Sequence, residues 1–132
     1  MLQVYTKNAT VEEGAQIPLT DVSVLKGKTA ELQGAASIIL NKCGVYKFSV
    51  DASVTPTEAG TVSIQMEKDG ILVPDAISQA TAEASSAYVL GFTKLVVVSA
   101  NNNCVCSLPA TVSFICGSDA SVDINVVVDK IV

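Results

Sequence analysis

The sequence contains no histidine, no tryptophan and, by direct count, no arginine, so all eight of its basic residues are lysines. Without histidine the chain cannot form a Ser-His-Asp or Cys-His nucleophilic site, and it has no imidazole ligand for a metal. Without arginine it has no bidentate guanidinium clamp for a phosphate group. These absences remove the commonest hydrolytic, metal-dependent and phosphate-binding sites from consideration.

Charge of both signs is scarce as well. Only 16% of the residues are charged, against about 25% in an ordinary soluble domain, while 49% are hydrophobic. So few charges cover the surface of a single 132-residue domain poorly, which predicts contacts between subunits. The net charge of −5 argues against a nucleic-acid partner.

The chain also lacks an uninterrupted run of the roughly 18 apolar residues that a membrane-spanning helix needs. Its longest candidate, residues 87–100, is interrupted by Thr93 and Lys94. The first residues lack the basic and apolar regions of a secretory signal. We therefore expect a protein that is made in a cytoplasm and does not cross a membrane.

Four cysteines are present, at Cys43, Cys104, Cys106 and Cys116. One C-x-C pair without a second close pair is a weak match to zinc-site spacing. Buried free thiols are favoured over a disulfide, since cysteine commonly behaves as a small apolar residue and a cytoplasm keeps thiols reduced. No metal site and no cofactor are predicted.

What the sequence does contain is β-branched residues that alternate with polar ones. Between residues 45 and 54, one face of the alternation is apolar and consists of Tyr46, Phe48, Val50, Ala52 and Val54. Residues 61–68 and 121–132 repeat the pattern. A period of two residues is typical of strands that bury one face against a core.

Turn signals separate these runs, among them Asp69-Gly70 and the cluster 117–119. Strands are expected near residues 2–6, 22–25, 30–33, 38–40, 45–54, 61–68, 71–74, 88–100, 104–108, 111–116 and 121–131. Pro74-Asp75 is expected to end the strand at residues 71–74. Residues 75–87 are then expected to form a loop rather than a helix, because they lack an apolar stripe. The predicted fold is all-β, an antiparallel two-sheet jelly-roll sandwich of about 8–10 strands.

The organisation along the chain has two parts, residues 1–30 and a jelly-roll domain at 31–132. For residues 1–30 two interpretations stay open: an extended arm that attaches the protein to a particle, or the leading strands of the sandwich. If residues 1–30 form an arm, the side chains expected to attach it to the particle are Leu2, Val4, Tyr5, Ile17 and Leu19.

A set of apolar side chains is expected to fill either the core or a subunit interface. Tyr46, Phe48, Phe92 and Phe114 fit the interior of the sandwich. The apolar residues on otherwise polar faces, Val96, Val98 and Val127, fit a subunit interface. A register slip of one residue would exchange the two sets, so the sequence leaves their assignment open.

Three stretches carry a resemblance to known proteins, namely residues 43–50, 59–65 and 68–76. Their order resembles that of the jelly-roll domains of the tumour-necrosis-factor and complement-globular-head superfamily. More narrowly, the layout of Asn41–Tyr46, Val54–Val62 and Cys104–Cys106 is similar to that of small proteins encoded by tailed phages. The resemblance covers roughly residues 35–132.

This resemblance implies a homotrimer that is a structural protein of the virion rather than an enzyme, either a capsid decoration or a head fibre. Its expected partner is a phage capsid or fibre protein. Two alternatives remain: a receptor- or glycan-binding tip of a phage fibre, and a jelly-roll tip on a bacterial spore or cell surface. Asn101–Asn103 and the nearby Tyr88 are the residues that partly fit a glycan site, and three copies of Asp51 or Asp123 on a trimer axis would suit Ca²⁺.

Overall fold

The computed structural model describes residues 1–98 and 110–132 and shows a sandwich of two five-stranded antiparallel sheets. The alternating runs at residues 45–54, 61–68 and 121–132 form three of its strands, as a two-residue period indicates. The ten strands are β1 (Leu2–Val11), β2 (Asp21–Leu25), β3 (Ala30–Gln33), β4 (Ser37–Leu40), β5 (Gly44–Pro56), β6 (Gly60–Lys68), β7 (Ile71–Ala82), β8 (Tyr88–Val98), β9 (Ala110–Cys116) and β10 (Ala120–Lys130).

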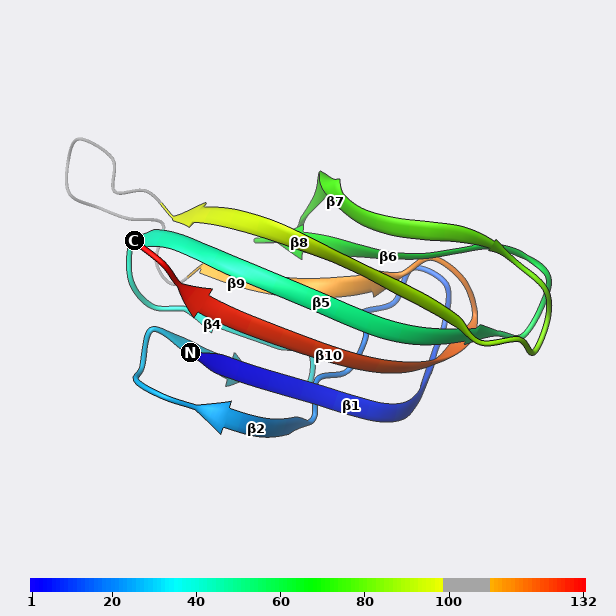
Figure 1. Cartoon of the computed structure of the whole chain (residues 1–132), viewed down its shortest axis with the longest axis horizontal. Helices are drawn as coiled ribbons and strands as arrows, with labels where there is room; N and C mark the ends of the chain where they lie inside the picture. Colours follow the sequence, from blue (N-terminus) through cyan, green and yellow to red (C-terminus); the bar gives the residue numbers. More distant parts are fainter. Residues whose placement is uncertain (99–109) are drawn as a thin grey trace.

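The first sheet has the strand order β2-β1-β10-β5-β8, and the second has the order β3-β4-β9-β6-β7 (Figure 1). Consecutive strands therefore often lie in different sheets, as in a jelly roll. The chain passes from β1 to the second sheet through a bridge between Gln16 and Ile115, and then returns to β2. The predicted all-β, two-sheet jelly-roll sandwich is confirmed.

The two ends of the sandwich differ in what they contain. One end, here called the termini end, holds both chain termini and the loops at residues 26–29, 41–43 and 69–70 (Figure 1). The opposite end, called the distal end, holds the loops at residues 57–59, 83–87 and 117–119 and the turn that follows β1. The strand register fixes this arrangement, since β1 and β5 both run antiparallel to β10.

The core lies between the sheets and is almost entirely aliphatic and aromatic. Tyr46, Phe48 and Phe114 are fully buried, and Phe92 is half-buried against them. Val96 and Val98, for which the sequence left core and interface open, point into the core, whereas Val127 is half-buried on the outer face of the first sheet. The run 95–98 is apolar throughout, so its periodicity could not show which residues face inward.

Residues 1–30 are part of the sandwich. β1 lies between β2 and β10, and a set of four side chains from this region is fully buried: Leu2, Val4, Ile17 and Leu19. Of the two interpretations left open for residues 1–30, the structure shows the leading strands of the sandwich, and these four side chains lie in the core. Of the proposed arm residues, Tyr5 alone is half-buried on the outer face.

The expected loop at residues 75–87 is wrong for its first part, because β7 continues to Ala82. Pro74 lies in an irregular stretch of β7 between Leu72, which pairs with Glu67, and Ile77, which pairs with Gln65. A proline is tolerated there, since β7 is an edge strand and this stretch makes no ladder pair. The inward-facing residues beyond it include Ala76 and Ala82, whose small side chains give little apolar signal.

No helix occurs among residues 1–98 and 110–132. The same residues accordingly offer no helix with the length and hydrophobicity to span a bilayer.

Candidate functional site

The outer face of the first sheet is the surface that faces away from the core, and it is read directly from the strand register. Side chains that alternate with the buried ones point outward, and paired residues form rows across the sheet. One such row runs from Tyr5 through Asn125 and Asp51 to Gly91. The next row runs through Val127 and Ser49 to Thr93.

Strand β8, at the edge of this face, carries large aliphatic side chains on the solvent side. Val89, Leu95 and Val97 are 83%, 51% and 56% exposed. Their neighbours on β5 are Ser53, Lys47 and Val45, respectively. A long edge strand with exposed aliphatic side chains promotes association between chains unless a partner covers it.

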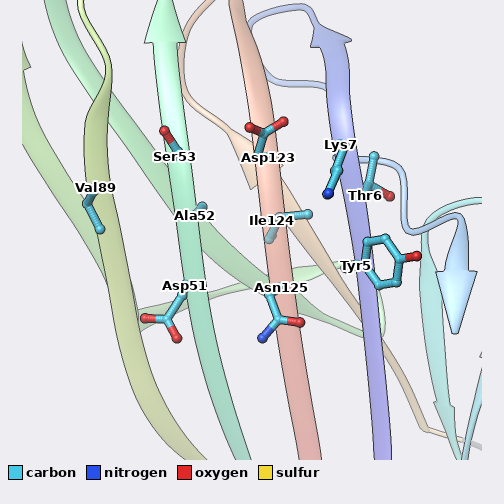
Figure 2. A pocket seen from close by; sticks show the side chains of 10 residues that line it. All are labelled: Tyr5, Thr6, Lys7, Asp51, Ala52, Ser53, Val89, Asp123, Ile124 and Asn125. Carbon is cyan, nitrogen blue, oxygen red and sulfur yellow. The ribbon is translucent and has the colours of Figure 1, made fainter. Parts of the chain in front are cut away.

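A shallow hollow of about 370 Å³ lies beside Val89 and crosses β1, β10, β5 and β8. Figure 2 shows Tyr5, Asp51, Asp123 and Asn125 along it, with Val89 at the β8 side. The hollow combines an aromatic ring, carboxylates and an amide on rigid neighbouring strands.

Hydrogen bonds hold several of these polar groups in place. The Gln3 side-chain amide donates to Asn125 Oδ1 at 3.1 Å, and the Asn8 backbone N–H donates to Asp123 Oδ1. Gly91 leaves room beside Asp51, because a Cβ built on Gly91 would lie 2.7 Å from the Val50 carbonyl oxygen. The polar part of the face is thus fixed by its strands rather than by a flexible loop.

Asp51 and Asp123, the residues considered for a shared calcium ion, are both exposed on this face but lie in different rows. Within the described part of one chain, no group of three or more acidic, cysteine or histidine residues could hold a metal ion. The carboxylates of one chain therefore do not form a cation site by themselves.

The outer face of the second sheet is different, because its groups hydrogen-bond to one another. Glu67 Oε1 accepts a hydrogen bond from the Ser113 hydroxyl at 3.4 Å, and the Gln16 amide donates to Ser113 Oγ at 3.2 Å. Gln65 donates to the Val73 carbonyl oxygen at 3.1 Å. Several polar groups of this face are thus held in hydrogen bonds, and Leu72 and Ile77 are exposed on it beside Glu67 and Gln65.

The open side of the sandwich, between edge strands β7 and β8, is closed by polar contacts. Lys94 Nζ lies 2.8 Å from Asp75 Oδ2, and the hydrogen bond from Lys94 lowers the pKa of the exposed Asp75 carboxyl below its usual value. The Gly91 N–H donates to Ser78 Oγ at 3.2 Å. Near the distal end, the Tyr88 hydroxyl accepts a hydrogen bond from the Glu83 N–H at 2.9 Å. One of the hydrogen bonds that this hydroxyl could make to a glycan is therefore already made within the protein.

The cysteines only partly follow the expectation of free thiols. Cys116 is a buried free thiol, as expected, whereas Cys43 is disulfide-bonded, which corrects the expectation for that residue. Cys104, Cys106 and the glycan candidates Asn101–Asn103 lie outside the described residues.

Burial raises the pKa of the Cys116 thiol above its usual value. We therefore expect Cys116 to resist alkylation by iodoacetamide at pH 8 in the native protein and to react at an ordinary rate in denaturant, because the thiolate is the reactive form. Peptide mass spectrometry after timed labelling measures both rates. Rapid labelling of the native protein would contradict the burial.

The raised pKa of Cys116 also has a consequence for stability. Because the folded thiol holds its proton more tightly than the unfolded thiol, Cys116 should stabilise the fold less as the pH rises above the pKa of the unfolded thiol.

Comparison with known proteins extends the description of the fold. No family model matches the chain, and no curated protein sequence matches it. Solved structures do match. The globular domain of zebrafish complement 1qA protein gives a TM-score of 0.75 at 9% identity, over 99% of this chain and 96% of that one. The structure of Eiger TNF from S. frugiperda gives 0.74 at 8% identity, over 99% of this chain and 92% of that one.

A third similar structure is PRD1 vertex protein P5, with a TM-score of 0.54 at 14% identity, over 95% of this chain and 93% of that one. Identities this low establish similarity of fold and nothing finer. The chain has the jelly-roll fold of tumour-necrosis-factor and complement globular heads, and a vertex protein is among its structural neighbours. These three neighbours are a complement globular domain, a TNF and a vertex protein, and none of them is described as an enzyme.

Proposed function

We propose that this chain is a non-enzymatic structural protein of a phage virion, a capsid decoration or head fibre that displays a homotrimeric jelly-roll head. The observation that carries the trimer is the exposed aliphatic set Val89, Leu95 and Val97 on the outer face of the first sheet. The virion assignment draws support from the resemblance of residues 35–132 to phage proteins and from the PRD1 vertex protein among the structural neighbours.

In the proposed trimer, each subunit covers the outer face of the first sheet of its neighbour. Burying a Val or Leu side chain that would otherwise be exposed contributes about 1.5–3 kcal/mol, so three such residues per subunit give a substantial driving force. The outer face of the second sheet, with its internally bonded Gln16, Glu67 and Ser113, stays in solvent. The low charge content of the chain follows from this burial, because a covered face needs few charges.

The native mass in solution tests the trimer. Three subunits of 13.6 kDa give about 41 kDa by light scattering. A mass of 13.6 kDa that persists as the protein concentration rises would contradict the trimer and leave a small binding module as the better description.

Substitution of Leu95→Asp is expected to convert the trimer to a folded monomer. The carboxylate would have to enter a dry interface without a partner, which is strongly unfavourable. Leu72→Asp is the matched control, since Leu72 is 48% exposed against 51% for Leu95 but lies on the β6–β7 hairpin. Light scattering in about 0.5 M salt measures the native masses of the two variants, and a thermal melt shows whether they are folded. The same native mass for Leu95→Asp and Leu72→Asp would place the interface elsewhere.

Proteomics of purified particles tests the virion assignment. We expect the chain in particles of the phage whose genome encodes it, in copy numbers that are multiples of three. A gene that lies among spore-coat genes, outside any phage genome, would instead favour the bacterial-surface alternative. Reproducible binding on a glycan array would favour the receptor-binding alternative, because a decoration protein should bind no glycan.

A further inference from the structure

The charged residues in the loops of this protein are sorted by sign between the two ends of the sandwich. The loops at the distal end contain five acidic residues and no lysine; the acidic residues are Glu12, Glu13, Glu58, Glu83 and Asp119. The described loops at the termini end contain three exposed lysines, Lys26, Lys28 and Lys42. Residues 99–109 contain no charged residue, so the sequence of that segment does not change the balance.

The one acidic residue in the described loops of the termini end is already engaged. Asp69 Oδ1 accepts a hydrogen bond from the Thr111 N–H at 2.8 Å. The same end also exposes aliphatic side chains on the β6–β7 hairpin, where Ile71 is 73% and Leu72 is 48% exposed. The termini end thus presents both lysines and exposed aliphatic side chains, a combination suited to a protein partner of opposite charge.

The distal end offers the complementary surface on the same molecule. Loops 57–59 and 117–119 and the turn after β1 enclose a hollow of about 180 Å³, with the carboxylates of Glu13, Glu58 and Asp119 among its lining groups. The Glu13 N–H donates to Asp119 Oδ1 at 2.8 Å, which ties two of these loops together. A lysine ammonium is a donor-only group, and these carboxylates are acceptors that would receive it.

From this complementarity we infer that the termini end of one copy docks on the distal end of a second copy, so that the heads stack into a fibre. Such a contact joins two different surfaces and does not close on itself, so it generates a linear assembly. The inference rests on the proposed function, because the stacking contact needs the trimer to be strong enough. A single exposed ion pair contributes little to binding, whereas two stacked trimers form three contacts together. Stacking would give the proposed head fibre a means of elongation.

An anionic polymer is the competing occupant of the lysine-bearing end. The net charge of −5, the absence of arginine and the exposed Ile71 and Leu72 favour a protein surface over a polyphosphate chain. Heparin serves as the probe for the competing occupant in the experiment below. Retention of the wild-type protein on heparin at a physiological salt concentration, without stacking, would overturn the inference.

Sedimentation velocity of the wild-type protein at about 20 mM and about 0.5 M salt is the first measurement. We expect species larger than the trimer at low salt, with at least a doubling of mass, and their loss at high salt, where charges are screened over a few ångströms. A trimer at both salt concentrations would overturn stacking while leaving the proposed trimer intact. A monomer at high salt would contradict the trimer. If that monomer forms larger species at low salt, stacking is still supported. If it stays a monomer at low salt, stacking is overturned.

Charge reversal at each end provides the decisive comparison. Glu12→Lys with Glu58→Lys cancels most of the negative charge of the distal loops, and Lys26→Glu with Lys28→Glu gives a protein that is acidic at both ends. Each double variant alone should lose the large species. An equal mixture should regain a species of twice the trimer mass, because the unaltered lysine-bearing end of the first variant again meets the unaltered acidic end of the second. All four positions are exposed, so we expect unchanged thermal melts.

The matched control is Asp21→Lys with Glu31→Lys, which changes the net charge as much as the first double variant but lies on β2 and β3. This control should stack like the wild type. Loss of stacking in the control, or failure of the mixture to recover it, would show that net charge rather than the pairing of ends governs association, and would overturn the inference.

Discussion

Removal of residues 1–30 is expected to leave a chain that does not fold. The deletion takes away β1 and β2 and uncovers β10, and it removes four fully buried aliphatic side chains, Leu2, Val4, Ile17 and Leu19. At about 1.5–3 kcal/mol for each of them, the loss is comparable to the 5–15 kcal/mol total stability of a typical domain. Far-UV circular dichroism and urea unfolding measure the result.

A point variant separates the loss of packing from the loss of chain length. Leu19→Ala should lower the free energy of unfolding by about 2–5 kcal/mol, because it opens a cavity in the core. Leu25→Ala is the control, since Leu25 is exposed and its truncation should cost no more than about 0.5 kcal/mol. A deletion product that folds and unfolds cooperatively would show that residues 1–30 are dispensable and would restore the interpretation of an attachment arm.

Substitution of Phe114→Ala has the second largest expected effect. The Phe114 ring on β9 contacts Phe48 on β5 and Phe92 on β8, with ring centroids 6.5 and 6.3 Å apart. It therefore joins the second sheet to the first through two tilted aromatic pairs, each of which adds about 0.5–1.5 kcal/mol beyond burial. We expect the free energy of unfolding to fall by about 3–5 kcal/mol in urea denaturation.

Phe92→Ala is the matched control for this prediction, because Phe92 is half-buried and makes one of the two ring contacts of Phe114. Its effect should be clearly smaller than that of Phe114→Ala. Equal losses in the two variants would mean that the outer edge of the core, rather than its centre, limits stability.

The strands were largely predictable from the sequence, since alternation over residues 45–54, 61–68 and 121–131 matches β5, β6 and β10 closely. Prediction was wrong where the local signal misleads. The proline in β7 indicated a strand end, but an edge strand tolerates proline where it makes no ladder pair. The second half of β7 buries alanines such as Ala76 and Ala82, which the pattern cannot distinguish from a loop.

The candidate interface was only partly accessible to sequence reasoning. The sequence left open whether Val96, Val98 and Val127 belong to the core or to an interface. In the structure Val127 is half-buried on the outer face, whereas Val96 and Val98 are buried and alternate with the exposed Leu95 and Val97. In a run of four apolar residues, alternation carries no information about direction. Only the pairing of β8 with β5, where Leu95 lies opposite Lys47, decides which side chains face solvent.

The sequence by itself determined that the protein is all-β, that it has no histidine for a Ser-His-Asp or Cys-His site and that it carries few charges. These properties follow from composition and from a period of two residues, which are local. The tertiary structure alone decided that residues 1–30 belong to the core, that the aliphatic residues of β8 lie on an outer face and that lysines and carboxylates gather at opposite ends. Each of these depends on which strands pair and in which register, and pairing joins residues that are far apart in the chain, such as Leu2 and Val128.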